Sequence, residues 1–196
     1  LDDGSSELVI TSLAADAKPG TQTLPAAEKT KYLSASTYIE SDHPDIKAAA
    51  QAALGEQPPT DPAERAWKIH DYVHSLVRWQ ANIGLPRSAL EILHNPAGVC
   101  RDNAALYTAL ARAAGLPTRI CAGVVYVNGS FMGHAWAETW LGRWQPFDAT
   151  LAERRVDATH LKLAEGEKYT CLFDMLPALG KLKIEVVEAD HGTVSG

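Results

Sequence analysis

The chain has 196 residues, of which 46% are apolar, and its formal net charge is −6 at neutral pH. This length fits one domain, with or without an appendage, and the composition suffices for an ordinary buried core. No stretch approaches the about 18 consecutive apolar residues of a membrane span, which argues against membrane insertion. Residues 1–60 carry four Lys or Arg against nine Asp or Glu, or −5, which leaves −1 for the remainder. A nearly neutral remainder without a basic stripe argues against nucleic acid as a partner.

The chain contains three cysteines, Cys100, Cys121 and Cys171, and no CxxC pair. An odd number with this spacing indicates neither a disulfide framework nor a zinc site. For Cys121 and Cys171 the alternatives are a disulfide between them or two separate buried thiols, and the buried thiols are favoured.

The chain begins with Leu1 rather than Met and shows no signal-peptide pattern near its start. Such a beginning is typical of a mature or excised fragment, so we expect further domains in a larger parent chain. An exported or periplasmic location is slightly favoured over a cytoplasmic one.

Residues 1–40 are rich in turns and predict an N-terminal extension or the tail of a preceding domain, with a strand at residues 7–10. Residues 41–196 form the predicted main domain. Apolar spacing and capping residues predict four helices in the first half of that domain. These helices are expected at residues 45–54, 62–79, 89–93 and 100–114. The second begins with Pro62 at its first position, which suits the fixed backbone angle of proline.

The second half of the domain contains runs of β-type sequence. They are residues 118–127, 133–141, 144–147 and 181–187. The turn at Asn128 and Gly129 predicts that the first two runs form an antiparallel hairpin, and the last run is expected to add an edge to the same sheet. The predicted fold class is therefore α+β, with helices packed on one side of an antiparallel sheet.

Three short motifs follow one another along these elements. Cys100 ends Gly-Val-Cys at the start of the fourth helix, His134 lies in Gly-His-Ala-Trp-Ala-Glu, and Asp148 lies in Trp-Gln-Pro-Phe-Asp-Ala-Thr. The histidine follows the cysteine by 34 residues (134 − 100), and the aspartate follows the histidine by 14 (148 − 134). This spacing suits a helix followed by two neighbouring strands, so the three side chains can meet.

In this order and with these flanks, residues 88–150 closely resemble the core of the transglutaminase-like superfamily, whose members use a papain-type thiol mechanism. The resemblance covers about a third of the chain. It implies a papain-like core with Cys100 at the N-terminus of the central helix. It also implies a catalytic set of Cys100, His134 and Asp148, and neither a metal nor an organic cofactor.

The chemistry explains why these residue types are needed. A thiol attacks an amide carbonyl as the thiolate, and a free thiol with a pKa of ~8.5 is mostly protonated at neutral pH. A helix N-terminus and a neighbouring imidazole both favour the thiolate, and here these are the start of the fourth helix and His134. A carboxylate on the second ring nitrogen fixes the tautomer and orientation of the imidazole, and Asp148 fits that role.

Other residues are weaker candidates for the site. Trp79 and Gln80 lie 21 and 20 residues before the predicted nucleophile. Either is a candidate oxyanion donor, because crosslinking members of the family use an indole N–H and papain-like proteases use a glutamine. Glu138, a further cleft candidate, lies four residues after the predicted catalytic histidine, on the same strand face, where it is expected either to orient the site or to belong to its polar surroundings. His160 is expected on a loop lining the cleft, and four further histidines are interpreted as surface or loop residues without partners: His43, His70, His74 and His94.

We expect a cysteine-dependent acyl-transfer enzyme that acts on amide bonds of peptides or proteins through a thioester. Hydrolysis, as in proteases and amidases, is favoured, because a chain of this length has no room for the acidic loops and further β-domains of calcium-dependent crosslinking. Only residues 80–87 form a connection long enough to cover the cleft. Two alternatives stay open: transglutaminase-type transfer to an amine, which crosslinks proteins, and a noncatalytic binding or scaffolding module that keeps the fold.

Overall fold

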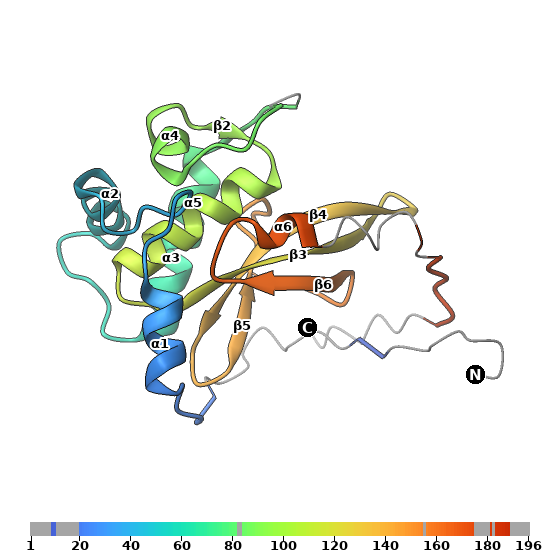
Figure 1. Ribbon diagram of the computed structural model, residues 1–196, viewed down its shortest axis with the longest axis horizontal. Coiled ribbons are helices and arrows are strands. Elements are labelled where there is room, and N and C mark those ends of the chain that lie inside the picture. The colour runs from blue at the N-terminus through green and yellow to red at the C-terminus, as the bar shows by residue number, and fades with distance from the viewer. Residues whose placement is uncertain are drawn as a thin grey trace, which may run out of the picture.

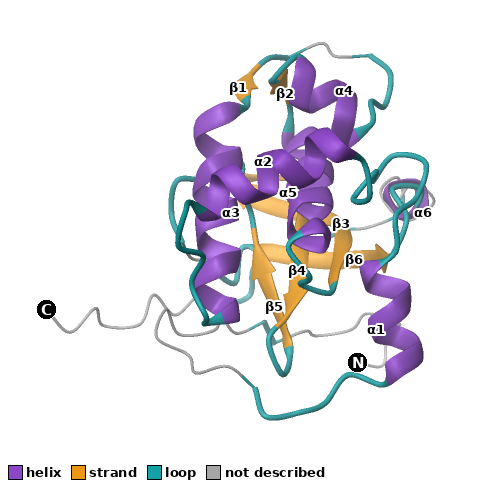
Figure 2. Ribbon diagram, turned by 90° about the vertical axis from the view of Figure 1, so that its left-hand side faces the viewer, coloured by secondary structure: helices purple, strands orange, loops and turns teal. Residues whose placement is uncertain are grey.

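The computed structural model describes residues 9–10, 20–81, 84–154, 156–174, 181 and 183–188. Helices α2, α3, α4 and α5 gather on one side of a four-stranded antiparallel sheet with the strand order β5-β4-β3-β6 (Figures 1 and 2). The predicted α+β class is therefore confirmed. Among the described residues, no helix combines the length and the apolar character that crossing a membrane requires.

The helices begin where the caps predict. Asp61 accepts a hydrogen bond from the backbone N–H of Ala63 (3.0 Å) with Pro62 at the first helical position, and Ser88 caps the short fourth helix. The helices are α1 Ala26–Leu33, α2 Pro44–Leu54, α3 Pro62–Leu76, α4 Ala89–His94, α5 Cys100–Ala113 and α6 Cys171–Asp174.

The predicted continuation of the second helix to Trp79 is wrong. Helix α3 ends at Leu76, and Arg78–Trp79 form a short strand, β1, parallel to β2 at Ala97–Gly98. The backbone N–H of Arg78 donates to the carbonyl of Pro96 (3.0 Å). This pairing with a segment about twenty residues away replaces the last helical turn.

The sheet consists of β3 Thr118–Val127, β4 Ser130–Trp140, β5 Trp144–Phe147 and β6 His160–Gly166. Asn128 and Gly129 have positive φ angles of 51° and 82°, so they form the predicted hairpin turn between β3 and β4. The predicted edge strand at residues 181–187 is wrong for residues 181 and 183–187, which form no strand among the described residues. Strand β6 pairs with β3 in its place.

Helix α5 lies at the centre of the fold. Its side chains Leu106, Tyr107 and Leu110 are fully buried, and each such burial contributes roughly 1.5–3 kcal/mol. The Tyr107 hydroxyl also forms a hydrogen bond with Thr139 on β4 (2.9 Å). These contacts fix the helix that begins at Cys100 against the strand that carries His134.

The predicted N-terminal extension is partly packed on the main domain. Its helix α1, which the sequence does not predict, buries Tyr32, and Ile39 belongs to the hydrophobic core. The backbone N–H of Gly20 donates to the carbonyl of Leu141 (2.7 Å). The predicted strand at residues 7–10 lies mostly outside the described residues, and Val9 and Ile10 are exposed. The domain boundary at residue 41 stays a prediction.

Gly123 on β3 occupies the tightest point of the sheet. It pairs with His134 on one side and with Lys162 on the other, where the register between β3 and β6 shifts. A Cβ at this position would lie 2.0 Å from the carbonyl oxygen of Leu161. We therefore expect Gly123→Ala to lower the free energy of unfolding by about 1–3 kcal/mol, because β6 must move away. Urea unfolding measures this change, with Gly84→Ala, whose Cβ would meet nothing within 4 Å, as the control. An unchanged midpoint for Gly123→Ala would contradict the argument.

Candidate active site

Cys100 is the first residue of α5 and is partly exposed. The buried Asp102 carboxylate accepts a hydrogen bond from the backbone N–H of Val99 (2.9 Å) and also lies near Arg87. A Cβ on Gly98 would lie 2.5 Å from the Cβ of Asp102, so only glycine fits there. This tight entry presents the thiol at the positive end of the helix dipole, where an anion is favoured.

The other two cysteines differ from Cys100. Cys121 and Cys171 are both free and buried. Burial raises the pKa of the Cys171 thiol to about 12 and that of the Cys121 thiol well above its ordinary value. The expectation of two separate buried thiols is confirmed, and at neutral pH both stay protonated and unreactive.

His134 lies on β4 between the predicted nucleophile and the predicted carboxylate. Its Nε2 is 2.6 Å from Oδ2 of Asp148, which leaves Nδ1 for the hydrogen bond to Cys100. Burial alone would lower the pKa of His134, but the hydrogen bonds to Asp148 and Cys100, together with their charges, raise it to about 10. The imidazolium is thus the favoured form at neutral pH when the thiolate is present.

Asp148 follows the last residue of β5 and is only 1% exposed. Burial would raise the pKa of this carboxyl, but the hydrogen bonds from His134 and His160 hold it well below its usual range. The backbone N–H of Thr150 donates to Oδ1 (2.9 Å). The carboxylate therefore stays ionised and hydrogen-bonded at both oxygens.

Three further histidines converge on the Asp148 segment. Nε2 of His160 lies 3.3 Å from Oδ2 of Asp148, and Nε2 of His70 donates to the Asp148 carbonyl (3.0 Å). Nδ1 of His74 is 3.2 Å from the Ala149 carbonyl oxygen. The interpretation of His70 and His74 as residues without partners is wrong, because both hold the backbone that carries the carboxylate.

The other two histidines also have partners. His43 accepts a hydrogen bond from the backbone N–H of Asp45 (3.2 Å) at the start of α2. Nε2 of His94 lies 2.8 Å from the Asp45 carboxylate. Both contacts are exposed and contain no predicted site residue, so these histidines serve local structure.

Trp79 and Gln80 lie beside the segment that leads into Cys100. Trp79 pairs with Gly98, and the backbone N–H of Gln80 donates to the Gly98 carbonyl (3.0 Å). The parallel β1–β2 pair thus brings both candidates to the nucleophile loop. Trp79 is 68% exposed, and its role as an oxyanion donor, like that of Gln80, stays a prediction.

Glu138 is paired with two cations of the sheet. Its carboxylate lies 2.6 Å from Nη2 of Arg119 and 3.0 Å from Nζ of Lys162. These two cations come from the neighbouring strands β3 and β6. The carboxylate is therefore engaged in an ion network within the sheet rather than with the imidazole of His134.

His134, Asp148 and His160 are the described residues whose arrangement comes nearest to a metal site, since their donor atoms lie within 4.8 Å of one another. Two ligands on one tetrahedral Zn²⁺ are about 3.3 Å apart, given metal–ligand distances of about 2.0 Å. The 2.6 Å between His134 and Asp148 is shorter than that. The arrangement fits a hydrogen-bonded set better than a metal centre.

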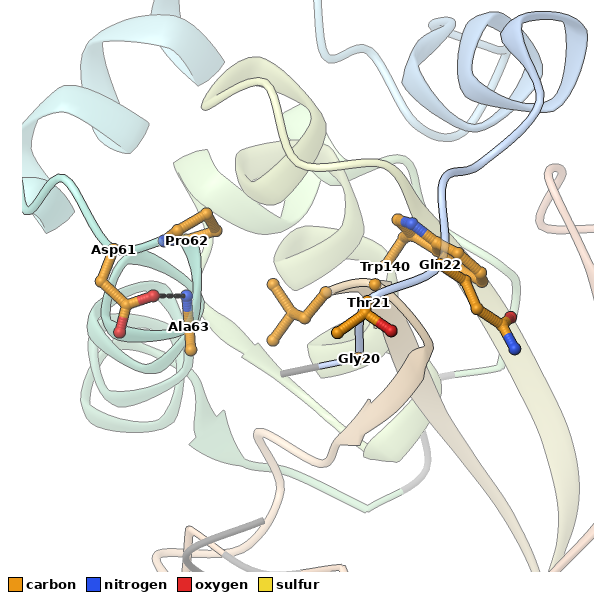
Figure 3. Close-up of a pocket in the computed structure, with 9 residues that line it drawn as sticks. Gly20, Thr21, Gln22, Asp61, Pro62, Ala63 and Trp140 are labelled. Atoms are coloured by element: carbon orange, nitrogen blue, oxygen red, sulfur yellow. Dashed lines mark hydrogen bonds between the residues drawn. The ribbon is translucent and has the colours of Figure 1, made fainter. Parts of the chain in front are cut away.

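A pocket of about 340 Å³ lies at the far end of β4, between α3 and the chain around Gly20 (Figure 3). Its described lining residues include none of the candidate catalytic residues. They are Gly20, Thr21, Gln22, Asp61, Pro62, Ala63, Trp140, Leu141 and Gly142. The pocket is therefore separate from the chemistry at Cys100.

Comparison with known proteins identifies several similar proteins. A protein of Mycobacterium leprae without an assigned function is 30% identical over 105 residues, which cover 50% of this chain and 36% of that protein. The crystal structure of a candidate cysteine protease from Cytophaga hutchinsonii has a TM-score of 0.60 and 27% identity, covering 76% of this chain and 51% of that one. The periplasmic domain of TgpA from Pseudomonas aeruginosa has a TM-score of 0.46 and 21% identity, covering 65% of this chain and 50% of that one.

The chain thus spans about a third of the curated relative and about half of each of these solved chains. Its residues 47–149, more than half of its length, match the model of the transglutaminase-like superfamily. The matched segment includes Cys100, His134 and Asp148. The sequence match and the α+β architecture together show that this chain belongs to the transglutaminase-like superfamily.

Proposed function

We propose that this chain is a cysteine-dependent hydrolase of amide bonds in peptides or proteins, with Cys100 as nucleophile. One observation carries the proposal: His134 is bonded to Asp148 at 2.6 Å through one ring nitrogen and to Cys100 through the other. Superfamily membership and the likeness to a candidate cysteine protease support a cysteine-dependent enzyme in general. The parent protein's substrates and further domains belong to the same proposal.

The reaction proceeds in two halves. The Cys100 thiolate attacks the carbonyl carbon, and the tetrahedral intermediate collapses as the C–N bond breaks and His134 gives its proton to the leaving amine. The thioester that remains is attacked by water, whose proton passes to His134. The C–S bond then breaks, which releases the acid product and restores the Cys100 thiolate beside the protonated His134. Asp148 keeps the imidazole oriented through both halves.

The oxyanion of each tetrahedral intermediate needs preorganised donors. The backbone N–H of Cys100, at the first position of α5, has no acceptor within the helix and is one candidate. A second donor must come from a neighbouring segment of this chain. The candidates are Trp79 in β1 and Gln80 just after it, because β1 pairs with the segment that leads into Cys100. One such donor contributes about 3 kcal/mol to catalysis.

Hydrolysis is favoured over transfer because Cys100 is partly exposed. A transferase must keep water from the acyl-enzyme until an amine arrives, which requires a dry tunnel or lid. Arg101 lies within 3.4–3.5 Å of the carbonyls of Gly84 and Leu85, so this part of the 80–87 connection runs past the first turn of α5. The apolar side chains of Leu85 and Trp79 are 80% and 68% exposed, so neither is packed against the protein as part of a closed lid.

A partition experiment tests this preference. An activated acyl ester is incubated with the protein and rising concentrations of a primary amine, and free acid and amide products are quantified. We expect free acid to remain the main product at millimolar amine, with Cys100→Ala as the inactive control. If the amide product dominated, the proposed hydrolase function would be wrong and the crosslinking transferase would take its place. Neither product above the Cys100→Ala background would favour the noncatalytic scaffolding module.

A further inference from the structure

His160 shares a carboxylate oxygen with the candidate catalytic histidine. His160 begins β6, the edge strand beside β3 (Figure 1). Its Nε2 lies 3.3 Å from Oδ2 of Asp148, the oxygen that also receives His134 at 2.6 Å. An ionised carboxylate has no proton to give, so the hydrogen in each contact comes from the imidazole.

The second donor decides how the carboxylate is oriented. A carboxyl group turns easily about the bond that joins it to its Cβ. The backbone N–H of Thr150 holds Oδ1 of Asp148 at 2.9 Å, and Nε2 of His160 lies 3.3 Å from Oδ2. Thr150 thus fixes one oxygen of the carboxylate and His160 fixes the other. Oδ2 therefore stays within hydrogen-bonding distance of His134 while His134 exchanges a proton with the substrate.

The ring of His160 is itself held on several sides. It packs edge-on against Trp136 with 5.3 Å between ring centroids, and the same indole stacks on His134 at 6.2 Å. Nδ1 of His160 faces Thr159 Oγ1 at 3.3 Å and Asp157 Oδ1 at 3.7 Å. A ring held in this way presents Nε2 to the carboxylate in one orientation.

We propose that His160 is a positioning residue, which donates its Nε2–H to Asp148 and keeps that carboxylate aligned with His134. The proposal rests on the proposed hydrolase function, and it goes beyond the Cys-His-Asp set by adding a fourth residue. His160 also lies edge-on to the ring of His134, with 5.4 Å between ring centroids, and the Phe variant keeps a ring there. The prediction that His160 lies on a loop is wrong, because it is the first residue of β6 and is buried.

Three substitutions separate positioning from packing. His160→Phe keeps a ring against Trp136 and loses the donor. His160→Gln places an amide N–H near the position of Nε2, and His160→Asn reaches only toward Thr159. The control is His94→Phe, an exposed histidine with its own carboxylate partner. Each variant is assayed for kcat and KM on an amide substrate, and the ring N–H of His134 is followed as a low-field proton resonance, assigned by its loss in Asp148→Asn.

We expect His160→Phe and His160→Asn to lower kcat about 10- to 100-fold, since a hydrogen bond to a charged group is lost, while KM stays within about twofold. The His134 resonance should shift or broaden in both, and His160→Gln should restore kcat and the resonance. Equal kcat in all variants, or equal loss in Gln and Phe, would overturn the proposal. If the wild-type protein hydrolyses no amide, the proposed function fails, and the resonance alone decides on His160: an unchanged signal in Phe and Asn overturns the positioning role.

Discussion

Replacing Asp148 by Asn is expected to lower kcat for amide hydrolysis about 10³- to 10⁴-fold, with the fold retained. The asparagine is the same size and still accepts the Thr150 N–H, but its amide group can turn a donor toward His134. The imidazole then takes the wrong tautomer or orientation, and the positive charge that forms on it loses its counter-ion. Steady-state kinetics with an amide substrate measures the loss, and circular dichroism verifies the fold.

Asp45→Asn is the matched control for this substitution. The Asp45 carboxylate also pairs with a histidine, at 2.8 Å from Nε2 of His94. This pair is exposed and contains no candidate site residue, so the amide variant should keep kcat within a few-fold. Turnover near the wild-type level for Asp148→Asn would show that this carboxylate is structural. Glu138 would not then be expected to orient His134 in its place, because its carboxylate is paired with Arg119 and Lys162.

Local signals in the sequence predict much of the fold. Strands β3 and β5 and the start of α5 lie where the sequence places them. Gly115 and Pro117 separate the helix from β3, and Asn128 with Gly129 requires the turn that ends β3. The candidate catalytic residues can be predicted for the same reason, because each lies in a short motif that is recognised from its immediate neighbours in the sequence.

The errors concern pairings and faces that depend on distant residues. The alternating run at residues 181–187 resembles an edge strand as closely as β6 does, and only the register with β3 distinguishes them. His70 and His74 lie four residues apart on α3, next to the buried Ile69 and Val73. That spacing indicates that both histidines lie on the inward face of the helix. The prediction is wrong because it assumes that a histidine on a helix lies at the surface.

Removing the imidazole of His134 is expected to slow the alkylation of Cys100 at pH 6 by about 100-fold. An ordinary thiol is only about 0.3% ionised at pH 6, whereas a thiolate beside an imidazolium is ionised already, although it is intrinsically less nucleophilic. In His134→Gln the partner that stabilises the anion is gone. Iodoacetamide labelling followed by mass spectrometry of the Cys100 peptide measures the rate, and the two buried thiols contribute no background on this time scale.

The ratio of the two alkylation rates should also depend on pH. The folded pKa of His134, about 10, lies above its ordinary value of 6.5, so the imidazolium is retained from pH 6.5 upward and is lost only as the pH rises through about 10. The alkylation rate of the wild-type protein should therefore stay nearly constant at pH 6–7. Its advantage over His134→Gln should fall about tenfold from pH 6 to pH 7, as the unassisted thiol ionises, and should shrink toward unity above pH 9. His94→Gln should follow the wild-type curve. Equal alkylation rates for wild type and His134→Gln at pH 6 would mean that no thiolate–imidazolium pair exists, and the nucleophilic role of Cys100 would lose its basis.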